Sequence, residues 1–256
     1  MLRIIESTRF VRILRHAFLT LAFFVAVEGF SQEEDWEYEI SASLWTGNTG
    51  VEVLPLDFSR AVDIDLPDFL DNYQLGFLLR GEAVKERFGV LLDVGYIQLS
   101  ASDEPEVPNV DRVSVDVNST LVTLSGIFRI HGSDKFRLDA LPGIQYYHSD
   151  SEIAVQGSMS GTASSNRSNW DPILGLRAKY VVFSKLDLGL FGSIGGFGAS
   201  SQSTTQFGAT AGYRLLELFS VHLGYRLIDW DFDEVEERRL ISQNISGVLV
   251  GFKLSF

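Results

Sequence analysis

The chain has 256 residues, no cysteine and a formal net charge of −13. The lack of cysteine excludes a disulfide framework and a thiolate metal site, and the acidic balance disfavours a nucleic-acid partner, whose phosphates need Lys and Arg. The length suits one domain, for which we expect no cofactor.

The first 31 residues have the pattern of a cleaved signal peptide. Four arginines within the first 15 residues precede an apolar run over 17–27, which is too short to span a bilayer as a helix. Gly29 and Ser31 supply the small residues that precede a cleavage site. A cut after Gly29 and a short membrane anchor are the alternatives. We expect residues 1–31 to be removed and 32–256 to form the mature domain.

From residue 36 onward, large apolar residues alternate with small or polar ones in segment after segment. In the first segment Trp36 and Tyr38 alternate with Glu37 and Glu39, and the last segment is an apolar row that ends on Phe256. Such alternation places the two sets on opposite faces of a β-strand. In chain order, the alternating segments lie at 36–44, 73–82, 88–96, 112–130, 136–146, 170–180, 186–194, 206–214, 219–226 and 248–256.

The connections between these segments alternate between short and long. Short ones lie near 85–87, 131–134, 183–185 and 216–218, and longer ones near 46–71, 101–111, 148–168, 199–204 and 231–239. Outer-membrane barrels have short periplasmic turns and longer external loops. We therefore predict an all-β protein, a transmembrane antiparallel up-and-down β-barrel of about ten strands. Eight or twelve strands would fit if the first and third long connections hide strand extensions.

This interpretation also predicts a location. The barrel would lie in the outer membrane of a Gram-negative bacterium, surrounded by outer-membrane lipid, with both termini in the periplasm. A monomer is expected. A soluble β-sandwich is the alternative fold, but it gives no common explanation for the signal peptide and the alternating loop lengths.

Two segments are irregular. In 112–130 the apolar residues change parity near Asn118, which a β-bulge or a strand projecting beyond the membrane would explain. Gly195, Gly196 and Gly198 follow the seventh segment and predict a bulge or kink.

Several motifs resemble those of a family. They are Trp170-Asp171-Pro172 followed by Gly175 and Arg177, Gly195-Gly196-Phe197-Gly198, Gly212-Tyr213-Arg214, Gly224-Tyr225-Arg226 and the terminal Phe256. Together they are similar to a group of uncharacterised Gram-negative outer-membrane β-barrel proteins, loosely called porin-like. The resemblance implies the fold and the location but no activity. It also implies that the barrel-assembly machinery reads Phe256 as an assembly signal.

The polar parity predicts a charged lumen. The residues expected to form this network are Glu37, Glu39, Arg80, Glu82, Asp93, Asp171, Arg177, Arg214, Arg226 and Lys253. In a narrow barrel, long side chains of opposite sign can meet, and buried charges persist only when they are paired. We expect Arg177, Arg214 and Arg226 to pair with lumen acids, and Lys253 to meet Glu37 or Glu39 across the closing seam.

Function is less constrained than fold. A salt-bridged structural barrel and a narrow mixed-charge channel both follow from the predicted lumen, whereas a wide porin needs more strands. Acidic loops near 57–71, 103–106 and 231–237 suggest a surface-binding or adhesive role, or a place for divalent cations. An outer-membrane hydrolase would need a nucleophile activated by a base, and the stretch 148–152, with His148, Ser149 and Ser151, offers these groups. We expect the protein not to be an enzyme.

Overall fold

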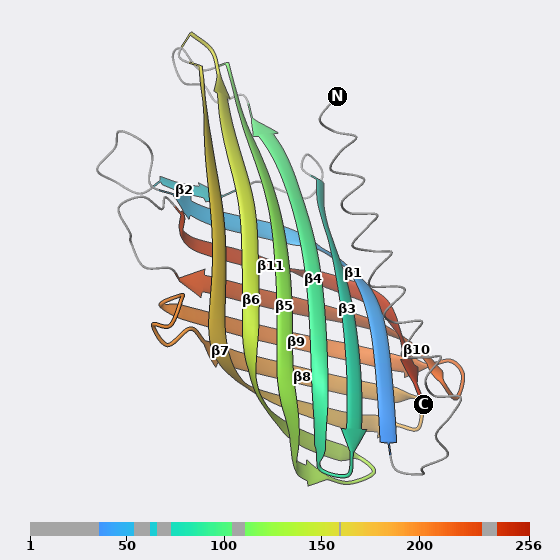
Figure 1. Ribbon diagram of the computed structural model, residues 1–256. Helices are drawn as coiled ribbons and strands as arrows, with labels where there is room; N and C mark the ends of the chain where they lie inside the picture. The colour runs from blue at the N-terminus through green and yellow to red at the C-terminus, as the bar shows by residue number, and fades with distance from the viewer. Residues whose placement is uncertain (1–35, 54–61, 66–72, 104–110, 159, 232–239) are drawn as a thin grey trace, which may run out of the picture. The chain divides into compact units, whose positions relative to one another are not determined.

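The computed structural model describes residues 36–53, 62–65, 73–103, 111–158, 160–231 and 240–256 (Figure 1). The proposed signal peptide lies outside the described residues. Within the described part of the chain, no helix is long and apolar enough to cross a membrane. The strands belong to one compact unit, Glu37–Phe256.

The described residues form eleven strands. In chain order they are β1 (Trp36–Val53), β2 (Val62–Asp65), β3 (Tyr73–Lys85), β4 (Phe88–Asp103), β5 (Arg112–Gly132), β6 (Phe136–Gln156), β7 (Gly161–Phe183), β8 (Leu186–Gly195), β9 (Ser203–Arg214), β10 (Phe219–Asp231) and β11 (Leu240–Ser255). Every segment predicted from alternation is contained in one of these strands or ends directly after it.

Ten of the strands close into a barrel. From β3 to β11 each strand pairs with its neighbours in sequence, β3 neighbours β1, and β11 pairs with β1 to complete the ring. The short strand β2 pairs with the C-terminal end of β1, over Gly50–Val53. It is not one of the strands that form the closed barrel wall. The prediction of a ten-stranded antiparallel barrel is therefore confirmed.

From Glu39 to Glu52 the seam between β1 and β11 is in continuous register, and a register shift follows between Glu52 and Val53. Glu39 lies opposite Ser255 and Ala42 opposite Phe252. Beyond the ladder, the Tyr38 amide donates to a terminal carboxylate oxygen of Phe256 at 2.8 Å, and the Phe256 amide donates to the Tyr38 carbonyl at 3.0 Å. The carboxy-terminal residue thus completes the hydrogen bonding of the closing strand.

The outer face of the barrel is apolar, as the alternation predicts. Large apolar side chains on this face remain exposed: Leu44, Val90, Leu92, Leu124, Ile144, Leu174, Leu176, Leu190, Leu223, Val250 and Phe252. Aromatic rings meet on the same face near the short turns, for example Phe88 with Phe128 at 5.5 Å between ring centroids. A belt of this kind suits a lipid environment, so the fold is that of a transmembrane barrel.

The four predicted short turns lie at one end of the barrel, which also holds Trp36 and Phe256. At the other end the strands are longer than the sequence indicated. The stretch 148–168, predicted to be a loop, consists mostly of β6 and β7, which pair as far as Val155 and Gly161. In Figure 1 this hairpin and the adjacent strand β5 extend beyond the other strands.

The parity change in β5 also reflects this extension. Pairing with β4 and β6 continues without a break through Asn118, so the bulge considered there is wrong, whereas the projection of the strand beyond the membrane stays a prediction. Val115 and Val117 point inward and pack with Leu99 inside the extended wall. The register shift of β5 occurs instead between Arg129 and His131, near the short turns.

The glycine-rich stretch after β8 is a turn and not a bulge within the strand. The φ angles of Gly196, Phe197 and Gly198 are +84°, +50° and +72°. This left-handed region suits glycine and is uncommon for a residue such as Phe. The turn reverses the chain after Gly195 and leads into the connection to β9.

Candidate functional site

The lumen contains the densest set of charged side chains that the structure describes. Asp93 on β4 lies at its centre and is 3% exposed. Arg80, on the adjacent strand β3, reaches the Asp93 carboxylate at 2.5 Å. Arg226, on the opposite wall in β10, approaches it at 3.4 Å and donates to the Gln206 side-chain oxygen at 2.9 Å. The two arginines therefore share one carboxylate across the barrel.

A second cluster lies beside the first. The Arg177 guanidinium contacts Glu82 at 2.5 Å and Asp139 at 2.9 Å. Asp139 also accepts a longer contact, 3.4 Å, from Arg129. Because Arg177 is on β7 and Glu82 on β3, this pair also crosses the lumen. The predictions that Arg177 and Arg226 pair with lumen acids agree with these contacts.

A third group lies at the mouth near the short turns. Lys253 meets Glu39 at 3.3 Å across the seam, while Glu37 meets Arg137 at 3.0 Å. Of the two partners considered for Lys253, the structure therefore selects Glu39. Lys179 also approaches Glu39, at 3.6 Å, and both lysines are 3.8 Å from Asp187.

Two predicted members stand outside this network. Arg214 is exposed at the rim and makes no ion pair with any residue that the structure describes. Asp171 is 1% exposed but faces neutral partners: it accepts hydrogen bonds from the Ser201 amide at 2.9 Å and the Ser201 hydroxyl at 2.7 Å. Its carboxylate therefore anchors the β8–β9 connection. That role requires the loop to fold back onto β7, which alternation does not reveal.

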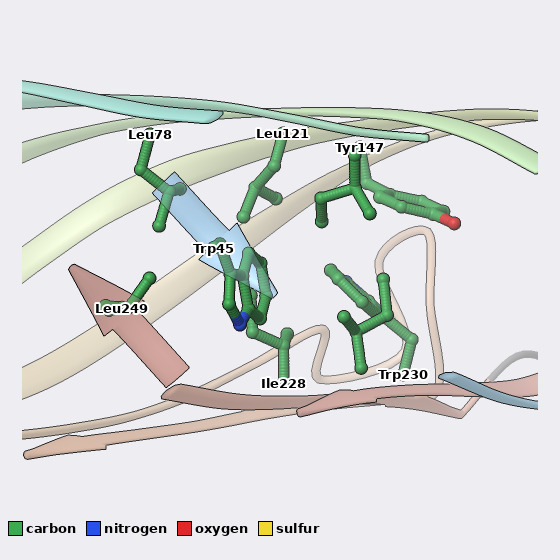
Figure 2. Close-up of a cluster of buried hydrophobic side chains, with 9 residues drawn as sticks. Trp45, Leu78, Leu121, Tyr147, Ile228, Trp230 and Leu249 are labelled. Carbon is green, nitrogen blue, oxygen red and sulfur yellow. The ribbon is translucent and has the colours of Figure 1, made fainter. Parts of the chain in front are cut away.

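Farther from the short turns, the lumen is filled by an apolar layer, which we call the seal. It comprises Trp45, Leu78, Ile97, Leu121, Tyr147, Ile228, Trp230, Ile245 and Leu249, none more than 8% exposed. Figure 2 shows Leu78, Leu121 and Tyr147 facing Ile228 and Trp230 from the opposite wall. The rings of Tyr147 and Trp230 stack at 4.5 Å, and the Tyr147 hydroxyl donates to Gln243.

The seal was not expected from the sequence. The signal that could have revealed it is parity, because Trp45 and Trp230 follow the inward alternation of their strands. The seal also contacts the charged clusters, since the Arg226 guanidinium lies 5.8 Å from the ring centroid of Trp45. A cation over an aromatic face is attracted by the electron density of the ring.

Between the seal and the short turns lies a cavity of about 530 Å³, which we call the vestibule. Its lining includes Glu39, Arg177, Lys253 and the terminal Phe256. Beside the Arg80–Asp93–Arg226 cluster, a void of about 20 Å³ lies among Thr123, Ser193 and Gln206. A void of that size holds about one water molecule.

His222 and His148 each contact a serine hydroxyl. His222 contacts the Ser43 hydroxyl in the lumen at 2.8 Å. His148 contacts Ser168 at 2.8 Å and Asp150 at 3.2 Å on the outer face of the β6–β7 hairpin. Ser149 is buried on the opposite face, so it does not pair with His148. Neither His148 nor Ser168 lines the vestibule or the smaller void.

The acidic loops lie almost entirely outside the described residues. Among the residues that are described, no group of three or more His, Asp or Glu side chains has a metal-binding arrangement. The divalent-cation hypothesis and the surface-binding hypothesis therefore stay predictions.

Comparison with solved structures identifies the architecture. The outer membrane protease OmpT from Escherichia coli aligns with a TM-score of 0.55 and 11% identity, over 88% of this chain and 98% of that chain. The chain has the fold of an outer-membrane β-barrel. The translocator domain of the autotransporter NalP from Neisseria meningitidis aligns with a TM-score of 0.44 and 12% identity, over 94% of this chain and 96% of that chain. The attachment invasion locus protein Ail from Yersinia pestis aligns with a TM-score of 0.38 and 14% identity, over 87% of this chain and 100% of that chain.

No family model and no curated protein matches the sequence. At these identities the likeness concerns fold alone. The outer-membrane barrel expected from the sequence is therefore confirmed as an architecture, and its role has to be argued from the lumen.

Proposed function

We propose that this protein is a non-conducting outer-membrane barrel with a structural, non-enzymatic role, whose lumen opens only toward the short turns. The seal is the observation that carries the proposal. Its side chains come from β1, β3, β4, β5, β6, β10 and β11 and are buried against one another. A ten-stranded barrel is narrow enough for side chains to fill its interior, so no wide path competes with this packing.

The physical barrier is the cost of moving an ion out of water. An ion in a dry apolar layer loses its hydration, which costs several kcal/mol even after the surroundings relax. On the vestibule side of the seal, Asp93 and Arg226 hold each other in place and keep the narrow centre occupied. These features favour a rigid closed wall over the narrow channel.

The proposal also includes the orientation of the barrel in the membrane and the role of Phe256 in its assembly. Short turns are periplasmic in outer-membrane barrels, so both chain ends and the vestibule would face the periplasm. Phe256 would serve as the signal that the assembly machinery reads, as the family resemblance implies. In the closed barrel its ring lies against Tyr38 at the seam, with 6.1 Å between ring centroids. The apolar belt would contact outer-membrane lipid, and the barrel would act as a monomer.

A labelling experiment with two introduced cysteines tests whether the lumen is closed. The natural chain has no cysteine, so each introduced thiol is unique. Ser41→Cys places one thiol in the vestibule, and Ser164→Cys places another on the exposed extension of β7. The doubly substituted protein is reconstituted in vesicles and treated from outside with a small, charged, membrane-impermeant thiol reagent.

A closed lumen predicts one label per chain in intact vesicles, whichever way each barrel is inserted, and two labels after the vesicles are dissolved in detergent. Mass spectrometry of the whole protein counts the labels. The two single-cysteine variants serve as matched controls, and their labelled fractions should add to one. Two labels on most chains in intact vesicles would overturn the closed-lumen proposal and favour a channel.

A further inference from the structure

The vestibule has the features of a small-molecule site that a purely structural wall does not require. Its volume of about 530 Å³ falls within the range of ordinary ligand pockets, roughly 300 to 1,000 Å³. The space exists partly because glycines line one side of it. At Gly208 an added Cβ would meet nothing closer than 3.6 Å, so the wall there is open to the cavity.

Two other glycines make room for polar side chains at the same wall. A Cβ on Gly189 would lie 2.5 Å from the Thr210 hydroxyl, and a Cβ on Gly212 would lie 2.8 Å from an Asp187 oxygen. Without side chains at these two positions, Thr210 and Asp187 can lie along the wall and line the cavity. The wall of the vestibule on β8 and β9 therefore includes exposed backbone and the short polar side chains of Asp187 and Thr210, beside Phe191 and Arg214.

The charge of the vestibule differs in sign from that of the whole protein. Nine Lys or Arg side chains and seven Asp or Glu side chains line it, whereas the chain carries a formal charge of −13. Counting the carboxylate of Phe256 leaves an excess of one positive charge. In a cavity with low-dielectric walls, such an excess attracts anions more strongly than it would on an open surface.

The Lys and Arg side chains of the vestibule differ in how closely they approach carboxylates. Arg80 and Arg177 hold carboxylates at 2.5 Å deeper in the lumen. Lys179 and Lys253 share Glu39 and Asp187 at 3.3 to 3.8 Å, distances longer than a charge-assisted hydrogen bond. Arg214 lines the cavity without an ion pair to any described residue. Near the mouth, ammonium and guanidinium donors can therefore bind an incoming oxyanion.

From this arrangement we propose that the vestibule binds a small anion carrying two or more negative charges on carboxylate or phosphate oxygens. Lys179 and Lys253 donate to its oxygens, Arg214 at the rim adds positive charge that attracts it, and the cavity beside Gly208 provides the space. This site goes beyond the closed-wall function, and binding requires no passage through the seal.

Calorimetric titration of the full-length barrel in a neutral detergent at low salt tests the proposal. The probes are inorganic phosphate and succinate, which separate the phosphate source from the carboxylate source. Saturable binding of at least one probe at one site per chain is expected. Gly208→Leu, which fills the cavity, should weaken binding at least about tenfold, and Ala209→Leu, its outward-facing neighbour on β9, should leave binding unchanged.

Arg214→Gln provides a second variant in case the filled cavity prevents folding, since this side chain is exposed and makes no ion pair among the described residues. It should weaken binding about tenfold, and raising the salt concentration should weaken binding of the natural protein. Failure of both anions to bind, or equal binding by the natural protein and folded Gly208→Leu, would overturn the proposal. Because the assay does not involve transport, its failure would leave the closed lumen unaffected.

Discussion

Replacing Arg226 by Ala should destabilise the barrel strongly, because this residue is 5% exposed and its guanidinium links two walls of the lumen. The substitution removes the contact with Asp93 at 3.4 Å, the hydrogen bond to Gln206 at 2.9 Å and the contact with the Trp45 ring. Breaking a buried ion pair costs about 3 to 5 kcal/mol when the partner is left uncompensated. Asp93 retains Arg80 at 2.5 Å, so we expect the lower end, about 3 kcal/mol.

Equilibrium urea unfolding in lipid vesicles, followed by tryptophan fluorescence, measures this loss. Arg214→Ala is the matched control, since it removes an equally charged side chain from the neighbouring strand. A surface substitution of that kind changes the unfolding free energy by no more than about 0.5 kcal/mol. We also expect Arg226→Ala to change stability more than permeability.

The reasoning about Arg226 would be refuted by a loss below about 1 kcal/mol. It would also be refuted by unchanged heat stability in detergent together with a clear gain in conductance. Either result would mean that Arg80 alone holds Asp93 adequately, and the second would also mean that Arg226 controls passage.

Three further substitutions test other parts of the structure. Gly251→Val should lower the unfolding free energy by about 2 kcal/mol, because a side chain there would meet the Ser43 backbone across the seam at 2.8 Å; an unchanged urea midpoint would contradict the observed register. Asp171→Ala should expose the β8–β9 connection to limited proteolysis, since Ser201 loses both hydrogen bonds; equal cleavage rates would refute the anchoring role. Deleting Phe256 should reduce the heat-modifiable fraction in cell membranes while the purified chain still refolds in detergent, and normal assembly would exclude an assembly signal.

The fold could be predicted because lipid outside and polar groups inside impose a period of two on each strand. Leu188, Leu190 and Ile194, for example, are outward in the structure as expected. The same signal fails where the outer face meets water. On the β6–β7 extension, outward positions carry His148 and Ser168, so polar residues occupy both faces and the strands resemble a loop in sequence.

The lumen could be predicted only as a list of inward charges. Which charges meet depends on the curvature of the closed sheet, and Arg226 is 133 residues from Asp93 in sequence. Asp171 shows the limit most clearly, because its partner Ser201 lies in a connection whose path alternation does not specify. The buried tryptophans of the seal follow the inward parity, but aromatic residues in barrels are expected mainly at the membrane interfaces.

Single-channel recording in planar bilayers tests the closed lumen most directly. The natural protein, shown to be folded by its heat-modifiable migration, should insert without discrete openings. Trp45→Ala combined with Trp230→Ala, which removes two large side chains from the seal, should produce measurable conductance in the same lipid. Stable, discrete openings of the natural protein, similar in size to those of the double variant, would contradict the claim that the seal closes the barrel.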